Sequence, residues 1–594
     1  MTLPTSASVR RDIPQASAPD DAVWCSDVMA DMLRTMDIPY VLLNPGASFR
    51  GLHDSIVNHL GNEKPQMIVT LHEEHAVAIA HGYTKVTGKP LASILHSNVG
   101  LMHGTMAIYD AWVDRVPVIV LGATGPVDAA KRRPWIDWIH TAQDQGALVR
   151  NYTKWDCQPA SIAASLEAML RARQIAMTAP QGPVYVCFDA ALQESKLSEK
   201  PSIPDIARYQ PPPPARPTDE LVIEAARMLS EAKRPVILMG RVSRDEAAWQ
   251  ERIELAETLQ AEVLTDLRIG AAFPTEHPLH AAPAGAFLSP AGQAALREAD
   301  VVLSLDWLDL SGTLKQAWGT GNVGSKVIQV SVDHYNHNGW SMDHQGLPPV
   351  DLFMACEPEP AVTLLNQHVK PRSTPAPARR PAAATPTQQQ GGPMTVPNLA
   401  ATLRRAVGDQ KVCLMRVPLS WSGEMWDLKH PLDYLGTDGG GGIGSGPGMA
   451  IGSALALKGT DRLPIAVIGD GDYMMGVNAF WTAANARIPA LIVVCNNRSF
   501  FNDELHQERV ARQRSRPIEN RWIGQRISDP APDLAMMARA QGLTGIGPVE
   551  DAAELERVLI DAIAAVKNGA TIVVDVIVQT GYSPAMTAGL TRAD

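Results

Sequence analysis

One stretch of the chain constrains its fold more than any other: the segment from residue 465 to residue 499. It begins with an apolar run, Ile465 to Ile468, that predicts a buried parallel strand. A helical stretch follows and ends at Pro489, and a second apolar run extends from Leu491 to Cys495. The segment therefore predicts a βαβ unit, the building block of a doubly wound α/β sheet.

Polar residues follow both predicted strands. Gly469-Asp470-Gly471 comes after the first strand, and Asn496-Asn497 comes after the second. Because open α/β sheets bind ligands at the carboxyl ends of their strands, we expect Asp470 and Asn497 to lie together there. Their oxygen atoms suit Mg²⁺, which takes few protein ligands and completes its shell with phosphate. An ordinary βαβ unit with a glycine turn and an asparagine cap is the alternative.

The spacing between these two residues matches a known pattern. Asp470 and Asn497 are 497 − 470 = 27 residues apart, so the segment reads GDG, a little under thirty residues, then NN. This closely resembles the cofactor motif of thiamine diphosphate (ThDP) enzymes. The resemblance implies that Asp470, the Asn497 side chain and the Ser499 carbonyl hold Mg²⁺, which grips the diphosphate. It also implies cofactor contacts at Gly471 and Asp472.

Composition narrows the class of protein. The chain has 594 residues, 45% of them hydrophobic, and a formal net charge of −11, so several cores are expected and nucleic acid is not a favoured partner. The sequence shows neither an apolar run of membrane-helix length nor the apolar core of a signal peptide after the N-terminus. Six scattered cysteines without CxxC indicate neither disulfides nor a zinc site. We expect a cytoplasmic protein with no membrane partner.

Two proline-rich stretches, at 209–217 and 371–393, divide the chain into three blocks. Each block alternates short apolar runs with helical stretches, which predicts an α/β protein with three doubly wound parallel-sheet domains. The expected boundaries are a mobile N-terminal tail at 1–20, a first domain at 21–195, a linker at 196–217, a central domain at 218–367, a low-complexity linker at 368–394, a third domain at 395–585 and a C-terminal tail at 586–594.

In the first block a predicted helix begins with acidic residues. His72-Glu73-Glu74-His75 follows the apolar run Met67–Thr70. A zinc-protease motif needs histidines four residues apart and is excluded, because position 76 is alanine. A carboxylate that stabilises a helix N-terminus explains the segment taken alone. Together with the HGYTKVTGKP that follows, however, it resembles the segment that carries the catalytic glutamate of ThDP enzymes. This implies that Glu73 hydrogen-bonds N1′ of the aminopyrimidine.

Two further segments resemble benzoylformate decarboxylase. Residues 44–48 (NPGAS) resemble its NPGS turn, and residues 95–100 (LHSNVG) resemble its LHSxxG segment, whose histidine works in the active site. The resemblance implies cofactor contacts at Asn44 and Gly46 and an acid–base role for His96. A structural histidine beside a turn is the alternative for His96.

The chain departs from benzoylformate decarboxylase at two places. The turn serine of that enzyme aligns with Ala47, and Ser48 comes one place late. Its second catalytic histidine, from the central domain, has no counterpart in residues 301–315. Cleavage of an aromatic 2-oxo acid is therefore not implied. We expect His103 to lie on a helix surface or an interface.

The third block begins with a segment, Leu414–Trp426, that predicts a strand end and a helix start, with Ser420 where relatives touch the diphosphate. The run 439–448 contains a GxGxxG match, which is a weak dinucleotide signal because no strand immediately precedes it. The ThDP resemblance implies instead that Ile443 is the apolar wedge that bends the cofactor. It also implies that the Gly441 carbonyl oxygen accepts a hydrogen bond from the 4′-amino group of the cofactor. A flexible glycine loop is the alternative.

The sequence leaves the roles of two regions open. Within segment 500–527, whose role stays open, the charge run Glu508–Arg516 favours a solvated helix over a lid. Phe500, Phe501 and Asp503 lie where relatives carry substrate-pocket side chains. The middle block resembles the central domain of the same family, in which some relatives bind FAD or a nucleotide. It carries no decisive motif for either, so we expect structural support and leave FAD open.

The resemblance extends from about residue 25 to about residue 580 and points to the benzoylformate decarboxylase, pyruvate decarboxylase and acetolactate synthase group. It implies pyrimidine-binding, central and diphosphate-binding domains, in a homodimer or homotetramer with active sites at the subunit interface. The implied reaction is decarboxylation of a 2-oxo acid through a C2-ylid and an enamine, with a small 2-oxo acid or aldehyde as substrate. Acetolactate synthase-like carboligation and 2-hydroxyacyl-CoA cleavage are alternatives. A non-catalytic ThDP-binding protein is disfavoured by the intact Glu73, Asp470 and Asn497.

Overall fold

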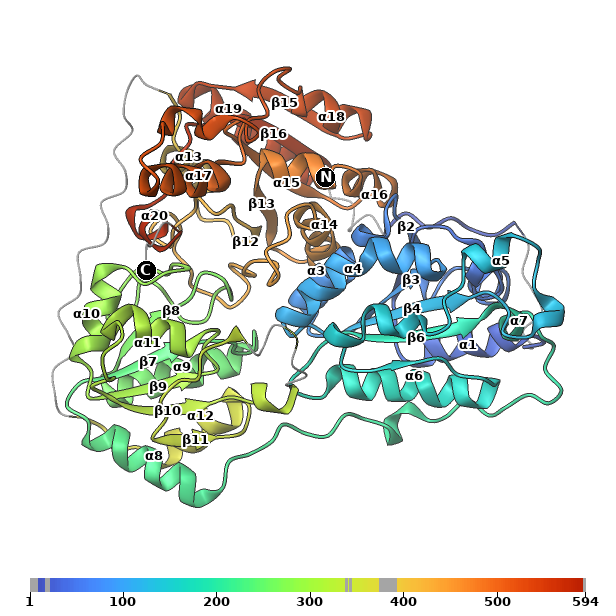
Figure 1. Ribbon diagram of the computed structural model, residues 1–594, viewed down its shortest axis with the longest axis horizontal. Coiled ribbons are helices and arrows are strands. Elements are labelled where there is room, and N and C mark those ends of the chain that lie inside the picture. Colours follow the sequence, from blue (N-terminus) through green and yellow to red (C-terminus); the bar gives the residue numbers. More distant parts are fainter. Residues whose placement is uncertain (1–8, 16–21, 337–339, 341–343, 373–392, 591–594) are drawn as a thin grey trace, which may run out of the picture.

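The computed structural model describes residues 9–15, 22–336, 340, 344–372 and 393–590, which form three parallel sheets (Figure 1). The strand orders are β2-β1-β3-β4-β6-β5, β11-β10-β9-β7-β8 and β12-β13-β14-β16-β15. Neighbouring strands run parallel, and the crossovers between them carry helices. The prediction of three doubly wound parallel-sheet domains is therefore confirmed.

The first sheet and its helices occupy the right of Figure 1. Its strands are β1 (Tyr40–Leu43), β2 (Gln66–Val69), β3 (Leu91–Leu95), β4 (Val118–Thr124), β5 (Asp156–Cys157) and β6 (Val184–Asp189). The helices are α1 (Cys25–Thr35), α2 (Arg50–Asp54), α3 (Glu73–Thr87), α4 (Ser97–Val113), α5 (Ile136–Ile139), α6 (Ile162–Met177) and α7 (Ala190–Gln193).

The central sheet lies at the lower left of Figure 1. Its strands are β7 (Pro235–Met239), β8 (Glu262–Thr265), β9 (Val301–Leu305), β10 (Lys326–Val330) and β11 (Leu352–Met354). The helices are α8 (Asp219–Glu231), α9 (Glu246–Leu259), α10 (Pro290–Glu298), α11 (Leu310–Trp318) and α12 (Pro358–His368).

The third sheet lies at the top of Figure 1. Its strands are β12 (Val412–Arg416), β13 (Leu463–Gly469), β14 (Ala490–Asn496), β15 (Thr544–Val549) and β16 (Thr571–Ile577). The helices are α13 (Val396–Val407), α14 (Gly446–Leu457), α15 (Asp470–Gly476), α16 (Ala479–Ala486), α17 (Phe501–Gln513), α18 (Leu534–Ala540), α19 (Ala552–Lys567) and α20 (Pro584–Leu590).

One expected element of this domain is wrong. The helix start predicted within Leu414–Trp426 does not form, because the chain leaves β12 at Arg416 and stays in turns and loop until α14. The Trp421 N–H donates to the Pro418 carbonyl at 2.9 Å, and the Gly423 N–H donates to Ala284 of the central domain at 3.0 Å. Turn and interdomain hydrogen bonds thus satisfy the backbone that a helix would otherwise pair.

The first and third domains share one hydrophobic core, which continues from one to the other through α3 and α14. The two helices cross with their backbones in contact. A Cβ atom on Gly82 would lie 2.0 Å from the carbonyl oxygen of Met449, and one on Gly452 would lie 1.9 Å from that of Ile79. The Ser453 hydroxyl donates to the Gly82 carbonyl at 3.1 Å. Glycine is therefore required at the crossing point.

The connecting segments run along the surface. Residues 196–217, the predicted linker, pass below α6 before reaching α8 (Figure 1), and the Ala215 N–H donates to Glu357 at 2.8 Å. Of the predicted N-terminal tail, residues 1–8 and 16–20 lie outside the described residues, whereas the Arg10 N–H donates to the Ala486 carbonyl at 3.2 Å. Most of the low-complexity linker, 373–392, also lies outside them, and the predicted C-terminal tail begins within α20. In the described ranges, every helix is too short or too polar to cross a membrane.

The α3–α14 crossing generates a stability prediction. We expect Gly452→Ala to lower the free energy of unfolding by about 1–3 kcal/mol, because the added methyl group forces two backbones apart. Calorimetric unfolding measures the change. Gly581→Ala is the matched control, since a Cβ at this exposed position meets no atom within 4 Å. Equal melting temperatures of the two variants would contradict the proposed close contact.

Candidate active site

The first half of the candidate site lies at the carboxyl edge of the third sheet. The register pairs Gly469 with Cys495, so the residues after β13 and β14 emerge side by side. The Ser499 N–H donates to Asp470 at 3.2 Å and to the Asn497 side chain at 2.9 Å. The structure thus brings together the three residues predicted to hold a metal ion.

Asp470 is a buried carboxylate with an exposed fraction of 3%. Burial raises its pKa to about 6, although hydrogen bonds from backbone N–H groups act in the opposite direction. Within the described part of the chain its partners are these backbone groups, and it makes no salt bridge. A buried carboxylate without a cation is costly, and a divalent ion would compensate the charge. The donor set therefore fits Mg²⁺.

The segment after the metal-site residues folds back over them. The Ser499 hydroxyl donates to Glu504 of α17 at 2.6 Å, and Glu504 forms ion pairs with Arg521 and Arg526 at 3.3 and 3.2 Å. Phe500 covers Gly471, where a Cβ atom would lie 2.5 Å from the Phe500 ring. Segment 500–527 is therefore anchored at the site through a buried glutamate. Phe501 is buried, and Asp503 is exposed.

The glycine loop before α14 is held from beneath by Arg416. This arginine, which ends β12, forms ion pairs with Asp438 at 2.7 Å and with Asp472 at 2.8 Å. Asp438 accepts the Gly441 N–H at 3.1 Å, and Asp472 accepts the Gly444 N–H at 2.7 Å. Asp472, which was predicted to contact the cofactor, thus shapes the loop.

The loop is open at the positions predicted to meet a pyrimidine ring. Gly441 has φ +72°, and a Cβ atom there would meet nothing within 4 Å. Ile443 is 40% exposed. An open left-handed glycine beside an exposed apolar side chain fits an aromatic ring that stacks against the loop. Ser420 is half-buried in the turn that follows β12, on the same edge of the sheet.

Asp110 of α4 lies below the same loop, so close that a Cβ atom on Gly440 would be 2.3 Å from its carboxylate. Burial, followed by the negative charge of Asp438, raises the pKa of Asp110 to about 9. Asp110 is therefore protonated at neutral pH. A protonated Asp110 adds no negative charge beside the Arg416 guanidinium, which pairs with Asp438 and Asp472.

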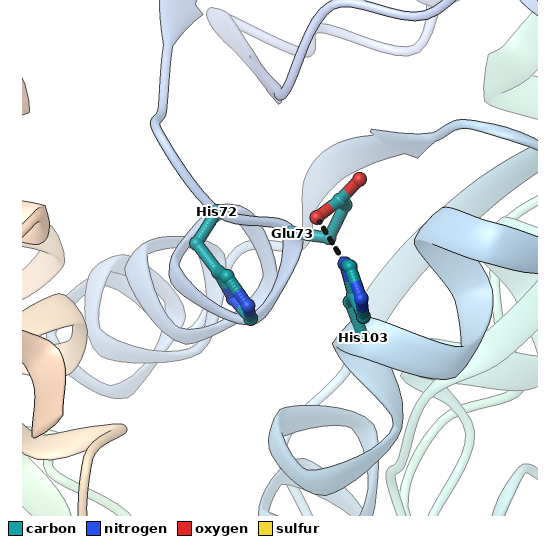
Figure 2. Close-up of side chains that lie close together, drawn as sticks. All are labelled: His72, Glu73 and His103. Atoms are coloured by element: carbon teal, nitrogen blue, oxygen red, sulfur yellow. Dashed lines mark hydrogen bonds and ion pairs between the residues drawn. The ribbon is translucent and has the colours of Figure 1, made fainter.

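The second half of the candidate site is the N-terminus of α3, where three side chains converge (Figure 2). Glu73 is the first residue of α3, its side chain is 8% exposed, and its carboxylate lies 3.1 Å from Nδ1 of His103. The ring of His103 stacks on that of His72, with centroids 5.1 Å apart. As expected, His103 lies on the surface of α4, where its side chain is 54% exposed, and it also contacts the predicted catalytic carboxylate.

This cluster supports the carboxylate better than it would bind a metal ion. Nδ1 of His72 accepts the Glu74 N–H at 3.2 Å, so the proton of the neutral ring is on Nε2. Nδ1 of His103 already faces Glu73. A metal ion bound by His72 would cost the bond from Glu74, and one bound at Nδ1 of His103 would cost the bond to Glu73. The arrangement instead fixes the orientation of Glu73 at the end of its helix.

His96 lies at the same edge of the first sheet. The turn after β1 packs closely against His96. Glycine is needed at position 46, because a Cβ atom on Gly46 would lie 2.3 Å from the His96 Cβ. The Ser48 hydroxyl lies 2.9 Å from Nδ1 of His96. Ser48, which the alignment put one place late, therefore contacts the predicted acid–base residue. Asn44 immediately follows β1 and is half-buried.

Sequence reasoning missed two residues near these half-sites. Glu74 points toward the third domain, with a carboxylate oxygen 3.9 Å from a Cβ built on Gly444, and burial and the charge of Asp472 raise its pKa. His140, which follows α5, has its ring centroid 5.0 Å from that of His96. The sequence indicated Glu74 only through its position next to Glu73. His140 belongs to none of the motifs.

The corresponding edge of the central sheet carries ion pairs. Arg241, which follows β7, pairs with Asp333 at 3.0 Å, and Arg115 of the first domain reaches the same aspartate at 3.1 Å. Asp306, at the end of β9, lies 3.9 Å from Arg241. Doubly wound sheets bind ligands at this edge. Here its charges pair with an arginine of the first domain, and structural support by the central domain stays a prediction.

Comparison with family models matches all three domains. The model described as thiamine pyrophosphate enzyme, N-terminal TPP binding domain, matches residues 23–148. The central-domain model of the same enzymes matches residues 222–342, and the C-terminal TPP binding domain model matches residues 418–576. Together these matches cover more than half of the chain.

Curated relatives are similar along most of the chain. Benzoylformate decarboxylase from Pseudomonas aeruginosa is 25% identical, over 73% of this chain and 79% of its own length. The mitochondrial acetolactate synthase catalytic subunit of Saccharomyces cerevisiae is 23% identical, over 87% of this chain and 76% of its own length. A probable 2-ketoarginine decarboxylase from P. aeruginosa is 25% identical, over 91% of this chain and 92% of its own length.

Solved structures share the fold. Benzoylformate decarboxylase from Polynucleobacter necessarius has a TM-score of 0.77 at 20% identity, over 95% of this chain and 100% of that one. A thiamine diphosphate-dependent 4-hydroxybenzoylformate decarboxylase from Rhodococcus jostii has a TM-score of 0.76 at 22% identity, over 94% and 99%. At this level of identity the likeness establishes the three-domain architecture.

The buried Asp110 generates a pH prediction. Its folded-state pKa of about 9 lies above the unfolded value, so its stabilising contribution is complete below about pH 4 and is lost as the pH rises toward 9. Asp110→Asn replaces the neutral acid with a group that does not titrate. We expect this variant to gain stability relative to wild type with rising pH, by up to about 1.4 kcal/mol per pH unit. Melting temperatures across this range measure it, and a pH-independent difference would refute the assignment.

Proposed function

Because the chain belongs to the thiamine pyrophosphate enzyme family, we propose that it uses ThDP and Mg²⁺ to cleave the carbon–carbon bond beside the carbonyl group of a 2-oxo acid. The products are CO2 and an aldehyde. The observation that carries the proposal is the enclosed carboxylate of Glu73 at the start of α3, with His103 at 3.1 Å. A carboxylate fixed in this manner suits a hydrogen bond to a nitrogen atom of the pyrimidine ring.

Each half-site would hold a different part of the cofactor. Bound ThDP supplies a nucleophilic carbon and an electron sink for the bond that breaks. Asp470, Asn497 and the Ser499 carbonyl would hold Mg²⁺ and through it the diphosphate. Gly441 and Ile443 would meet the pyrimidine ring, and Glu73 would bond to its N1′ atom.

The residues around His96 act on the substrate side. The Ser48 hydroxyl lies 2.9 Å from Nδ1 of His96, so Nε2 would be the ring nitrogen that meets the substrate. An Nε2–H group can donate a hydrogen bond to a carbonyl oxygen on which negative charge develops. The Arg133 guanidinium is close enough to lower the pKa of His96, after the larger effects of burial and His140.

The relatives support two outcomes of the same chemistry. Benzoylformate decarboxylase and the probable 2-ketoarginine decarboxylase favour decarboxylation with release of an aldehyde. Acetolactate synthases match the chain at similar identity and favour the second candidate, carboligation to a second carbonyl compound. The two functions differ in which compound captures the activated carbon. Product analysis therefore separates them.

A shared site between two subunits is part of the proposal. Near Glu73, Leu71 and Met102 are 43% and 55% exposed, and near the glycine loop Ile443 and Met475 are 40% and 58% exposed. Apolar side chains exposed on both half-sites suit burial against a second copy of the chain. We therefore propose a homodimer as the smallest active unit, with a homotetramer as the alternative, and light scattering measures the mass.

The metal site generates a binding prediction. We expect ThDP to raise the melting temperature of the wild-type protein in the presence of Mg²⁺, by the equivalent of about 2.7 kcal/mol at a hundred times Kd. Asp470→Asn should lose this rise, because the ion loses its buried anionic ligand. Asp461→Asn, at an exposed pair with Lys411, is the control. A full ThDP-dependent rise in Asp470→Asn, or in wild type without a divalent ion, would refute the assignment.

The catalytic carboxylate generates an activity prediction. We expect Glu73→Gln to bind ThDP but to lose at least about 100-fold in kcat, because an amide cannot exchange a proton with the pyrimidine. CO2 and aldehyde or hydroxyketone are measured with a panel of 2-oxo acids, with and without an aldehyde acceptor. Glu63→Gln is the control, since its side chain is 68% exposed. Turnover at the wild-type rate in Glu73→Gln would exclude the proposed role.

A further inference from the structure

His140 and His96 share a small cavity that no sequence motif indicated. Their ring planes are inclined by 46°, with the centroids 5.0 Å apart. A cavity of about 90 Å³ opens beside the rings, and Ala47, Ser48 and Arg133 also line it. This is the volume of about three water molecules. The cavity can therefore receive a carboxylate or a carbonyl group next to both rings.

Hydrogen bonds fix different tautomers of the two rings. The Ser48 N–H donates to Nδ1 of His96 at 3.4 Å, so this nitrogen is an acceptor and the proton of the neutral ring is on Nε2. Nδ1 of His140 lies 2.8 Å from the Ile136 carbonyl oxygen, which can only accept. His140 therefore carries its proton on Nδ1 and has a free lone pair on Nε2.

We propose that His140 is the proton carrier of the reaction and that His96 is the hydrogen-bond donor beside it. This inference rests on the function proposed above. Conversion of R–CO–COO⁻ and H⁺ to R–CHO and CO2 breaks one carbon–carbon bond and leaves its electron pair on the former carbonyl carbon. The single proton consumed forms the new C–H bond. His140 takes this proton from solvent at Nε2 and delivers it, while Nε2–H of His96 donates to the substrate oxygen.

The surrounding charges agree with this division of roles. Burial lowers the pKa of His96 most, followed by the ring of His140; Glu73 acts in the opposite direction, and Arg133 lowers it further. A lowered pKa favours the neutral ring of His96, which agrees with the tautomer that its hydrogen bond from Ser48 selects. Two other charged groups, Arg50 and Asp137, line the cavity. Each is already paired, Arg50 with Glu194 and Asp137 with Arg133.

Buried anchors fix the segment that carries His140. Asp137 is 3% exposed and accepts the Arg133 N–H at 2.6 Å, and Thr141 donates to the Asp137 carbonyl at 2.5 Å. Asn98, in the first turn of α4, donates to the Ile139 carbonyl at 3.3 Å. The ring of His140 is therefore held toward His96 from both sides of the cavity. It supplies a second histidine where the central domain offers none in residues 301–315.

The first test uses the full-length protein without cofactor. Diethylpyrocarbonate modifies neutral imidazole, so the pH dependence of its reaction with His96, followed by peptide mass spectrometry, reports the pKa of that ring. We expect the midpoint for His96 to move to higher pH in His140→Gln, because a neighbouring ring that can become cationic is removed. His368→Gln, at an exposed position on α12, is the control and should leave the midpoint unchanged. An unchanged midpoint in His140→Gln would contradict the coupling of the two rings.

The second test measures turnover. We expect His140→Gln to keep the ThDP-dependent rise in melting temperature and the KM for the 2-oxo acid, and to lose about 100-fold or more in kcat for aldehyde release. Added imidazole should restore part of the rate in His140→Ala, since it can enter the space left by the ring. With an aldehyde acceptor present, His140→Gln should form a larger share of hydroxyketone than wild type does. In the variant, protonation of the activated carbon competes less well with its addition to the acceptor.

The outcomes separate the two proposals. Wild-type turnover with an unchanged kcat and pH profile in His140→Gln would overturn the role of His140 and leave the proposed function intact. A loss of kcat in His140→Ala that imidazole does not rescue would assign His140 a structural role and would also overturn the proposal. Absence of turnover in wild type despite bound ThDP would overturn the proposed function and the role of His140 together.

Discussion

The crossing of α3 and α14 is the contact on which the rest of the structure depends. Gly82 and Gly452 let the two backbones touch, so the distance between the helices is set by main-chain atoms rather than by deformable side chains. One helix begins with Glu73, and the other follows the glycine loop directly. The crossing therefore fixes the catalytic edge of the first domain against the third. Their common core makes them a single structural unit, to which the central domain is attached.

A second constraint acts on the glycine loop itself. The positive charge of Arg416 is shared by Asp438 and Asp472, and each of these carboxylates accepts a backbone N–H group of the loop. Four glycines in a row would otherwise leave the backbone free to adopt many conformations. The buried network selects one of them from below, and neutral Asp110 completes it without adding a third negative charge. The upper face of the loop is thereby left for a ligand.

Sequence reasoning found the residues whose positions follow from regular structure. Asp470 and Asn497 were predictable because parallel register brings successive strand ends together. Ser48 was ambiguous, since a one-residue offset matters at a turn: a 3₁₀ turn at Ala47–Phe49 buries Ser48 and exposes Ala47. His140 was unpredictable from pattern, because it lies in an irregular segment 140 − 96 = 44 residues after its partner. The failed helix within 414–426 has the same origin, since contacts with another domain satisfy its backbone.

The partners of the buried acids explain which sheet edges are available to a ligand. Among the residues that the structure describes, Asp470 at the third sheet has only backbone N–H partners, and Glu73 at the first sheet has a histidine. Both carboxylates can accept a cation or a donor from a ligand without the loss of an internal ion pair. At the central sheet Asp333 is held by two arginines, one of them from the first domain. Breaking such a buried pair costs about 3–5 kcal/mol. A ligand at the central edge would therefore have to compete with the ion pairs that dock the first domain, which favours the two edges joined by α3 and α14 for chemistry.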